Sequence, residues 1–136
     1  VAAHLARGIE ASNMGDPIED FVRLELSRPR VMPDGVVKAV VGHIDRFGNI
    51  VLNVTRSSLE ALLEKTQASG FVAASGNIRV TQRFRTYVEA PQGTPFLLFN
   101  SSDFLEIAAN QARASDLLKV RRGDMIDVIL VQQGAQ

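Results

Sequence analysis

The chain has 136 residues, of which 46% are hydrophobic and 22% are charged, a length and composition that suit one globular domain with its own core. Fifteen basic and fifteen acidic residues give a formal charge of zero, which argues against the Lys- and Arg-rich surface of a general nucleic-acid binder or a polybasic membrane anchor. No apolar run approaches the roughly 18–20 residues that span a bilayer, and the lack of cysteine excludes disulfides and thiolate metal sites.

The start of the chain predicts little regular structure. Residues Ala2–Arg7 suit a short helix that Gly8 would end. Phe21–Leu26 alternates apolar and polar residues, as a half-buried strand does. Because the chain begins at Val1, and not at a methionine, we interpret its first segment as the end of a preceding structure.

The next part of the chain has mostly the pattern of β-strands. Val36–Ile44 is rich in valine and predicts a strand with both faces partly covered. Ile50–Val54 predicts a second strand after a Phe-Gly-Asn break. Ser57–Lys65 changes to helical spacing with three leucines on one side, and Ser57 and Glu60 have the spacing of a capping box.

Asn77–Glu89 is the longest alternating stretch and predicts one strand with an apolar and a polar face. The apolar face would hold Ile78, Val80, Phe84 and Val88, and the polar face Arg79, Thr81, Arg83, Arg85 and Tyr87. The remaining pattern predicts a strand pair at Phe96–Asn100 and Phe104–Ala109, a short helix at Arg113–Lys119 and a closing strand at Met125–Val131. Short strands separated by turns predict a mainly β fold, a small antiparallel β-barrel with two short helices.

The turn between the first two of these strands carries Asp45, Phe47 and Asn49. As structural residues, the two polar side chains would form the turn and the phenylalanine would plug the end of the barrel. As binding groups, the ring would stack on a flat base, the amide would pair with the edge of a heterocycle, and the carboxylate would bind an ammonium. The residue types alone leave both interpretations open.

The segment Asn100–Glu106 presents the same choice. It is either a polar hairpin turn or a small anion pocket in which Ser101, Ser102 and backbone N–H groups hold a carboxylate. Tyr87, the single tyrosine, is either an exposed aromatic without a role or a ligand contact. The two histidines are far apart in the sequence, so we predict no metal site from these residues. No nucleophile–base pair has a spacing that would indicate nucleophilic catalysis.

Five stretches, in this order, resemble the family of S-adenosylmethionine hydroxide adenosyltransferases, whose relatives include the S-adenosylmethionine-dependent chlorinases and fluorinase. The stretches are VAAHLARG, GHIDRFGNIVLNV, TYVEAPQG, FNSSDFLEIAANQARASDLL and RRGDMIDVIL, and they cover most of the chain. The most specific part is the Asp-Arg-Phe-Gly-Asn run together with Asn-Ser-Ser-x-Phe-Leu-Glu-Ile-Ala.

The resemblance implies an N-terminal α/β domain followed by a C-terminal β-barrel. Residues 1–30 would be the terminal helix and linker of the N-terminal domain, which is otherwise missing, and residues 31–136 would be the barrel domain. The implied reaction is attack of water on C5′ of the ribose, which converts S-adenosyl-L-methionine to adenosine and L-methionine. The resemblance implies that an Asp–Arg–His set carries out the chemistry of the water molecule, and in the family this set lies in the N-terminal domain. We therefore assign no catalytic residue, and in particular not Asp45, Arg46 or His43.

The resemblance implies that residues of this chain bind the substrate. Asp45 matches an acid that contacts the methionine ammonium, Phe47 an aromatic beside the adenosine, and Asn49 an amide that reads the adenine. Tyr87 sits where relatives place an aromatic on the base. The remaining matches are Ser101 and Ser102, which would hold the methionine end, and Asn110 and Gln111, whose backbone would border the adenine.

Departures from the family pattern distinguish the possible nucleophiles. The halogenating relatives carry arginines where this chain has Ser102 and Ala109, which favours the hydrolase over a halogenase such as a chlorinase. Asp103 stands where the family usually shows glycine, so the local turn is expected to differ. A third alternative, from another functional class, is a non-catalytic barrel that binds a nucleoside or mediates assembly.

The resemblance also implies partners. We expect a homotrimer in which the barrel meets the N-terminal domain of its own or a neighbouring subunit, with S-adenosylmethionine or adenosine as ligand and no cofactor besides the substrate. We expect neither a nucleic-acid nor a membrane partner, and a cytoplasmic location. The chain by itself is expected to bind weakly and to be inactive, because catalysis would depend on positioning across the interface between domains.

Overall fold

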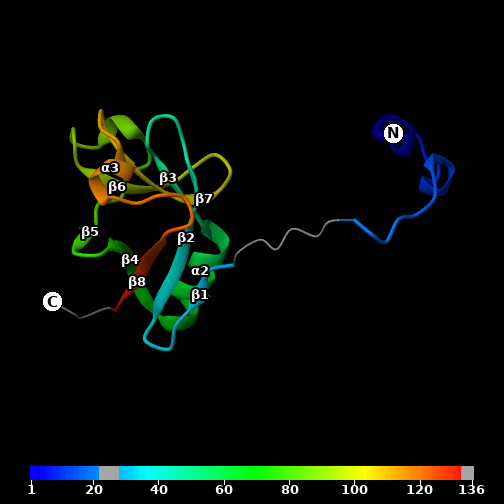
Figure 1. Cartoon of the computed structure of the whole chain (residues 1–136). Coiled ribbons are helices and arrows are strands. Elements are labelled where there is room, and N and C mark those ends of the chain that lie inside the picture. Colours follow the sequence, from blue (N-terminus) through cyan, green and yellow to red (C-terminus); the bar gives the residue numbers. More distant parts are fainter. Residues whose placement is uncertain (22–27, 133–136) are drawn as a thin grey trace.

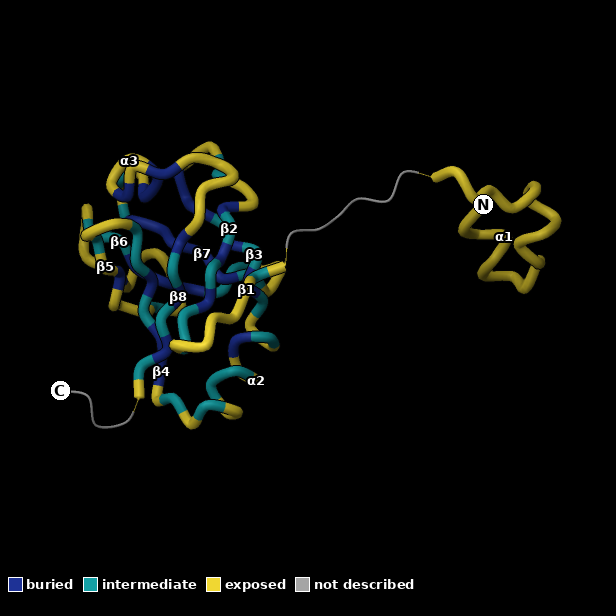
Figure 2. The backbone as a smooth tube through the Cα atoms, turned by 60° about the horizontal axis from the view of Figure 1, so that its bottom comes forward, coloured by how far each residue is buried: buried dark blue, intermediate teal, exposed yellow. Residues whose placement is uncertain are grey.

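The computed structural model describes residues 1–21 and 28–132. At the start of the chain, α1 (Ala2–Ala6) confirms the predicted short helix, and a short 3-10 helix, η1 (Ala11–Met14), follows it. All residues of these elements are exposed (Figure 2). The strand predicted at Phe21–Leu26 lies, apart from its first residue, outside the described residues.

Within the described residues, eight strands form one antiparallel sheet in the order β5-β4-β8-β2-β3-β7-β6, with β1 pairing to β2. A bridge between Arg83 and Leu97 links the segment after β5 to β6, so the two ends of the sheet approach each other and the barrel is nearly closed (Figure 1). This confirms the predicted fold class. The strands are β1 (Arg30–Val31), β2 (Val36–Ile44), β3 (Ile50–Thr55), β4 (Ala68–Ser75), β5 (Ile78–Val80), β6 (Pro95–Phe99), β7 (Phe104–Ala109) and β8 (Met125–Gln132).

The main core fills the barrel because alternate residues of each strand point inward. On β2 the inward positions are Val37, Ala39 and Val41, all fully buried, and on β8 they include Ile126 and Val128. Figure 2 shows this buried interior in dark blue. Each of the valine and isoleucine side chains contributes roughly 1.5–3 kcal/mol when it is fully removed from water, so burial of the core is a main source of the stability of the barrel.

Two short helices decorate the barrel, as predicted. They are α2 (Arg56–Thr66), which buries Leu59 against the core, and α3 (Ala114–Leu118), which follows β7. The predicted capping box of Ser57 and Glu60 is wrong, because the helix begins earlier. The side chain of Thr55 is the N-cap, and its Oγ1 accepts the backbone N–H of Ser58 at 3.3 Å.

The single long strand predicted at Asn77–Glu89 is also wrong. Only its first part is a strand, β5, and the chain then crosses toward β6 and forms a 3-10 helix, η2 (Tyr87–Glu89). Val88, expected on the buried face, is 87% exposed. β4, for which no strand was predicted, pairs with β5 on one side and with β8 on the other.

The segment from Phe84 to Ala90 has a structural task that explains this departure. It covers the outer face of β6 and β7, where Phe96, Leu98 and Ala108 form a second, smaller core with Ala90. The rings of Phe84 and Phe96 meet edge to face, with centroids 5.5 Å apart. Both faces of this strand pair are therefore buried, one inside the barrel and one under the covering segment.

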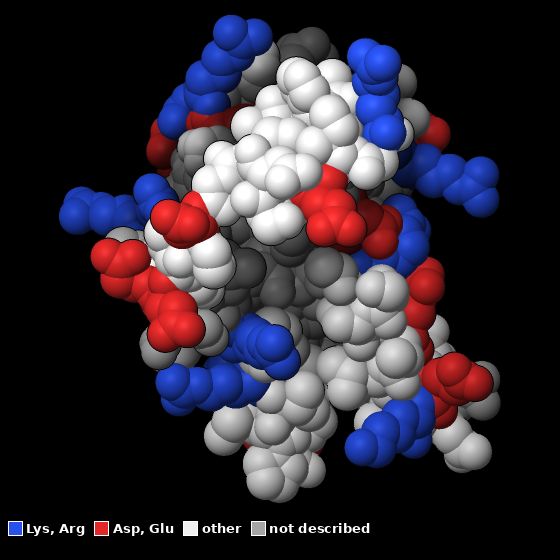
Figure 3. Space-filling model, turned by 90° about the vertical axis from the view of Figure 1, so that its right-hand side faces the viewer, with Lys and Arg blue, Asp and Glu red and all other residues white. Residues whose placement is uncertain are grey.

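Charges on the molecule are mixed. On the face in Figure 3, Lys and Arg side chains alternate with groups of Asp and Glu and do not gather into a large patch of one sign. In the described part of the chain, no helix combines the length and apolar character that crossing a membrane requires.

Candidate functional site

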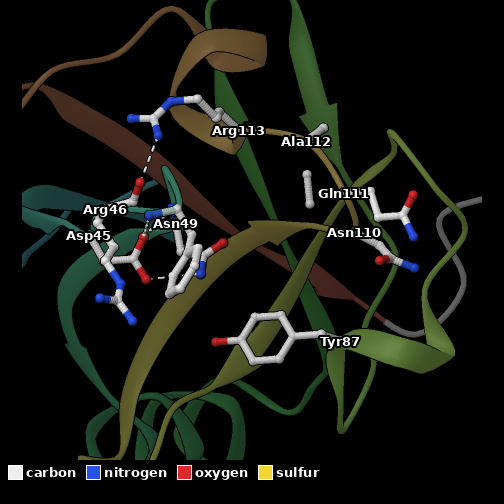
Figure 4. A pocket seen from close by; sticks show the side chains of 10 residues that line it. Asp45, Arg46, Asn49, Tyr87, Asn110, Gln111, Ala112 and Arg113 are labelled. Carbon is white, nitrogen blue, oxygen red and sulfur yellow. Dashed lines mark hydrogen bonds between the residues drawn. The ribbon is translucent and has the colours of Figure 1, made fainter.

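A cleft of about 620 Å³ opens at one end of the barrel, within the size range of small-molecule sites. Three segments distant in sequence form it: the turn between β2 and β3, the helix η2, and the stretch that follows β7 (Figure 4). Its lining consists of Asp45, Arg46, Phe47, Asn49, Tyr87, Ala109, Asn110, Gln111, Ala112 and Arg113.

The Asp45 carboxylate organises the β2–β3 turn. Its Oδ1 accepts the backbone N–H groups of Phe47 and Asn49, each at 2.9 Å, and its Oδ2 accepts the Asn49 side-chain amide at 3.0 Å. The structural interpretation of Asp45 is thus correct. A carboxylate offers about four acceptor positions and these bonds use three, so capacity for one more donor remains beside the cleft.

Asn49 and Phe47 reach the cleft from this turn in different ways. Asn49 is buried, at 7% exposure, and after donating to Asp45 it keeps one N–H and its carbonyl oxygen for a further partner. Phe47 is 60% exposed and does not plug the barrel end. The Arg46 guanidinium lies over the Phe47 ring, 4.7 Å from its centroid.

The β2–β3 turn is fastened to the start of α3. The carbonyl of Gly48 accepts the Ser115 N–H at 2.9 Å, and Arg113 Nη1 donates to the carbonyl of Arg46 at 2.8 Å (Figure 4). Gly48 has φ +84°, and a Cβ there would lie 2.6 Å from the Cβ of Arg113. Only glycine permits this approach, which holds the β2–β3 turn against the stretch that follows β7.

Tyr87 forms the opposite wall. Its side chain points from η2 toward the side of the cleft that holds Asp45 and Asn49 (Figure 4). The hydroxyl donates to Oε1 of Glu106 at 2.6 Å. Burial, then the hydrogen bond and charge of Glu106, then the charge of Asp45, raise the pKa of Tyr87 well above its ordinary value of 10.0, so the phenol stays protonated and acts as a donor.

The stretch after β7 supplies the third wall. Asn110 Nδ2 donates to the carbonyl of Ala90 at 2.8 Å, and the Asn110 carbonyl accepts the Gly93 N–H at 2.9 Å, so this wall is tied to the segment that carries Tyr87. Gln111 is exposed and has a left-handed backbone, with φ 54°. Ala109 and Ala112, which also line the cleft, have small side chains that leave its space open.

The structure brings six of the eight predicted binding residues to this cleft and leaves two elsewhere. Ser101 and Ser102 lie in the exposed turn between β6 and β7 and are not part of the lining. The N–H of Ser102 donates to Oδ1 of Asn100 at 3.0 Å. Asp103, at the position where the resembling family usually has glycine, takes a left-handed φ of 64°. The role of both serines stays a prediction.

Sequence reasoning missed three groups around the site. Arg46 and Arg113 line the cleft, and the hydrogen bond from the Arg113 side chain to the Arg46 carbonyl joins them. No pattern in the sequence indicates this contact. Glu106, 4% exposed, lies behind the Tyr87 wall. A charged residue at the centre of an otherwise apolar strand, Phe-Leu-Glu-Ile-Ala, is the signal that marks Glu106 for attention.

Within the part of the chain that the structure describes, neither a second groove nor a metal-binding group adds to the predicted site. A second groove of about 490 Å³, lined mostly by β1, β3 and α2, contains none of the predicted binding residues. Among residues 1–21 and 28–132, no group of three or more His, Cys, Asp or Glu side chains is placed to hold a metal ion.

The chain is thus a nearly closed β-barrel domain with a polar, aromatic-walled cleft of small-molecule size at its end. Residues 39–127 match the sequence model described as the S-adenosylmethionine (SAM) hydroxide adenosyltransferase C-terminal domain, and the chain belongs to this family.

Four curated relatives of this chain carry the same name. The chain is 32% identical to the "(R)-S-adenosyl-L-methionine hydrolase" of Salinispora arenicola over 94% of its own length, and 34% identical to the protein of that name from Thermus thermophilus over 90%. It covers 46% and 42% of these two relatives. The chain thus spans about half the length of the curated relatives it matches.

Solved structures agree with the fold. The crystal structure of a conserved protein from Thermotoga maritima matches with a TM-score of 0.71 and 26% identity, covering 94% of this chain and 48% of that protein. The crystal structure of a conserved protein from Thermus thermophilus matches with a TM-score of 0.60 and 28% identity over the same shares.

Proposed function

We propose that this chain is the substrate-binding C-terminal domain of an S-adenosyl-L-methionine hydrolase. The observation that carries the proposal is the cleft in which six residues, matched in advance to a SAM-binding pattern, meet from three distant segments. The shared name of the relatives supports the same substrate. The whole protein would convert SAM and water to adenosine, L-methionine and a proton.

In this proposal the cleft holds the adenosine part of the substrate. The free donor and acceptor of Asn49 pair with the adenine edge, and the exposed ring of Phe47 and the ring of Tyr87 flank the nucleoside. Aromatic faces and carboxylates also suit the positive sulfonium. The remaining acceptor position of Asp45 takes the methionine ammonium, and Ser101 and Ser102 hold the carboxylate end.

The chemistry itself is assigned to the N-terminal domain. The oxygen of water attacks C5′, the bond from C5′ to sulfur breaks, and methionine leaves with the electron pair while the water proton goes to solvent or a base. The barrel would contribute by fixing C5′ against that domain, of its own or a neighbouring subunit. A homotrimer and a cytoplasmic location, where SAM is made and used, complete the proposal.

Two alternatives are less well supported. A halogenase would place a halide where the hydrolase places water, but Ser102 and Ala109 replace the arginines of the halogenating pattern and the curated relatives named above are hydrolases. A non-catalytic nucleoside-binding barrel would use the same cleft. Analysis of the products that the whole protein forms from SAM, with and without chloride, separates these alternatives.

The proposed role of Asp45 predicts a difference between two ligands. Asp45→Asn removes the negative charge that would meet the methionine ammonium, whereas adenosine has no ammonium. We expect the affinity for SAM to fall by about tenfold or more relative to the affinity for adenosine, since a charge-assisted hydrogen bond contributes about 1.5–3 kcal/mol. Isothermal titration calorimetry of both ligands measures this ratio.

Asp45 also accepts a hydrogen bond from Asn49, which is proposed to bind adenine, so Asp45→Asn is expected to change the affinities for both SAM and adenosine. The ratio of the two affinities isolates the effect on the ammonium contact. Asp127→Asn is the matched control, since that half-exposed carboxylate pairs with Lys38 away from the cleft. Equal losses for SAM and adenosine in Asp45→Asn would remove the ammonium contact from the proposal. The titrations use the whole protein, because the chain alone is expected to bind weakly. Absence of binding by the whole wild-type protein would contradict the proposed function itself.

A further inference from the structure

Glu106 is buried in a place where a charged side chain is costly. It lies at the centre of β7, 4% exposed, opposite Leu98 of β6 and on the same outer face as Ala108. A carboxylate in such surroundings is tolerated only when hydrogen bonds satisfy its oxygens. Each of the two oxygens has one partner, and the two partners belong to different parts of the proposed site.

The first oxygen holds the aromatic wall of the cleft. Oε1 accepts the Tyr87 hydroxyl at 2.6 Å, a short charge-assisted bond. Tyr87 sits on a single turn of 3-10 helix in a segment without strand pairing, and its ring meets Phe96 edge to face at 6.1 Å. The bond to Glu106 therefore fixes the direction in which the phenol points across the cleft.

The second oxygen holds the turn that carries the two serines. Oε2 accepts Nδ2 of Asn100 at 3.2 Å. The other end of that amide, Oδ1 of Asn100, accepts the backbone N–H groups of Ser102 at 3.0 Å and Phe104 at 3.1 Å. Asn100 thus links the buried carboxylate to the β6–β7 turn.

We propose that Glu106 is a positioning residue that couples the tyrosine wall of the cleft to the serine-bearing turn, and so sets the nucleoside end and the amino-acid end of the site relative to each other. It does so without touching the ligand, since it is absent from the cleft lining. This inference rests on the proposed function. A carboxylate suits the role, because both partners donate to it and each of its two oxygens accepts one of them.

The decisive variant is Glu106→Gln, which keeps the size of the side chain but has one acceptor oxygen in place of two. If the glutamine oxygen accepts from Tyr87, its amide N–H faces the Asn100 amide, donor against donor. If the oxygen accepts from Asn100, the amide N–H faces the Tyr87 hydroxyl, which can accept it but then no longer donates to a carboxylate. Asn100 cannot simply rotate its amide, because its Oδ1 holds two backbone N–H groups. Both links are expected to weaken, and SAM affinity to fall about tenfold.

Two spectroscopic readouts report the links directly. Tyr87 is the single tyrosine of the chain and there is no tryptophan, so tyrosinate absorbance at about pH 11, where an unperturbed tyrosine is mostly ionised, reports one phenol alone. We expect little tyrosinate in the wild type and clearly more in Glu106→Gln. Nuclear magnetic resonance (NMR) of the Asn100 side-chain amide and the Ser102 backbone amide reports the second link.

Tyr87→Phe is the matched partner of this variant, because it removes the first link and keeps the ring against Phe96. The Asn100 and Ser102 signals are expected to move in Glu106→Gln and to stay in place in Tyr87→Phe. Asp127→Asn controls for loss of a carboxylate away from the site and should leave all readouts unchanged. If Glu106→Gln does not fold, as judged by circular dichroism, Glu106→Asp, which keeps the charge but shortens the side chain, serves for the same readouts.

The outcomes separate the inference from the function on which it rests. Movement of both spectroscopic signals together with a tenfold weaker SAM affinity would support the coupling. A wild type that binds SAM and a Glu106→Gln variant that binds it equally well, or that moves only one of the two signals, would overturn the coupling alone. The affinities are measured on the whole protein and the spectroscopic signals on the 136-residue chain. A whole wild-type protein that binds neither SAM nor adenosine would overturn the proposed function, and the positioning role with it.

Discussion

Replacement of Phe96 by alanine is expected to lower the free energy of unfolding by about 3–5 kcal/mol, the usual cost of truncating a fully buried aromatic side chain. Phe96 is 0% exposed and is the largest member of the second core, beneath the segment that carries Tyr87. Its ring is the surface on which Phe84 and Tyr87 rest. Domains of this size have a total stability of about 5–15 kcal/mol, so the loss is a large share.

Urea unfolding followed by circular dichroism measures this effect. Phe47→Ala is the matched control, because it deletes the same ring at a position that is 60% exposed and should cost about 1 kcal/mol or less. If the two variants lost equal stability, the second core would not be packed as described. The covering segment would then lack the support that places Tyr87 at the cleft.

Gly48→Ala is expected to lower the free energy of unfolding by about 2–4 kcal/mol, because two costs add. A side chain at φ +84° is strained, and the new Cβ would lie 2.6 Å from the Cβ and 3.0 Å from the Cα of Arg113. These atoms belong to the backbone and the root of a side chain, so relief requires the turn to move away from α3. The displacement would carry Asp45 and Asn49 with it and weaken ligand binding.

The chain offers a matched control for the conformational part of this cost. Gly123 has a similar φ of +93°, but a Cβ there meets nothing within 4 Å. Gly123→Ala should therefore cost only about 1 kcal/mol and leave binding of adenosine unchanged. Equal destabilisation by the two substitutions, measured from urea midpoints, would show that the turn does not press against Arg113.

Much of the barrel could be predicted from the sequence because its strands are short apolar or valine-rich runs separated by turn residues. The predicted bounds of Val36–Ile44 and Phe104–Ala109 match β2 and β7 as observed, and the neighbouring strands differ by a residue or so at their ends. β4 escaped prediction because Ala68–Ser75 is rich in small residues without alternation, and its conformation comes from pairing with β8 and β5.

The error at Asn77–Glu89 has the opposite cause, since alternation there was real but misleading. Phe84 is held by Phe96 of another strand, and Oε2 of Glu89 accepts the backbone N–H of Arg85, so tertiary contacts overrode a local period of two. The row of arginines predicted on one strand face does not exist, because Arg83 lies over the ring of Phe71, 5.1 Å from its centroid.

The candidate site was predicted as a set of residue types but not as a geometry. Asp45, Phe47 and Asn49 were identifiable because they share one turn, and the structure gives Asp45 the turn-forming role that the sequence left open. The approach of Gly48 to Arg113, and the link from Tyr87 through Glu106 to Asn100, join residues far apart in the chain. Such contacts leave no local pattern from which to infer them.

The central claim is tested most directly by product analysis of the whole protein, of which this chain is proposed to be the substrate-binding domain. The protein is incubated with SAM in buffer with and without chloride, and the products are separated by chromatography and identified by mass. We expect adenosine and L-methionine in equal amounts, independent of chloride, and no turnover by the 136-residue chain alone. A 5′-chlorinated adenosine, or SAM left unconsumed by the whole protein, would contradict the account.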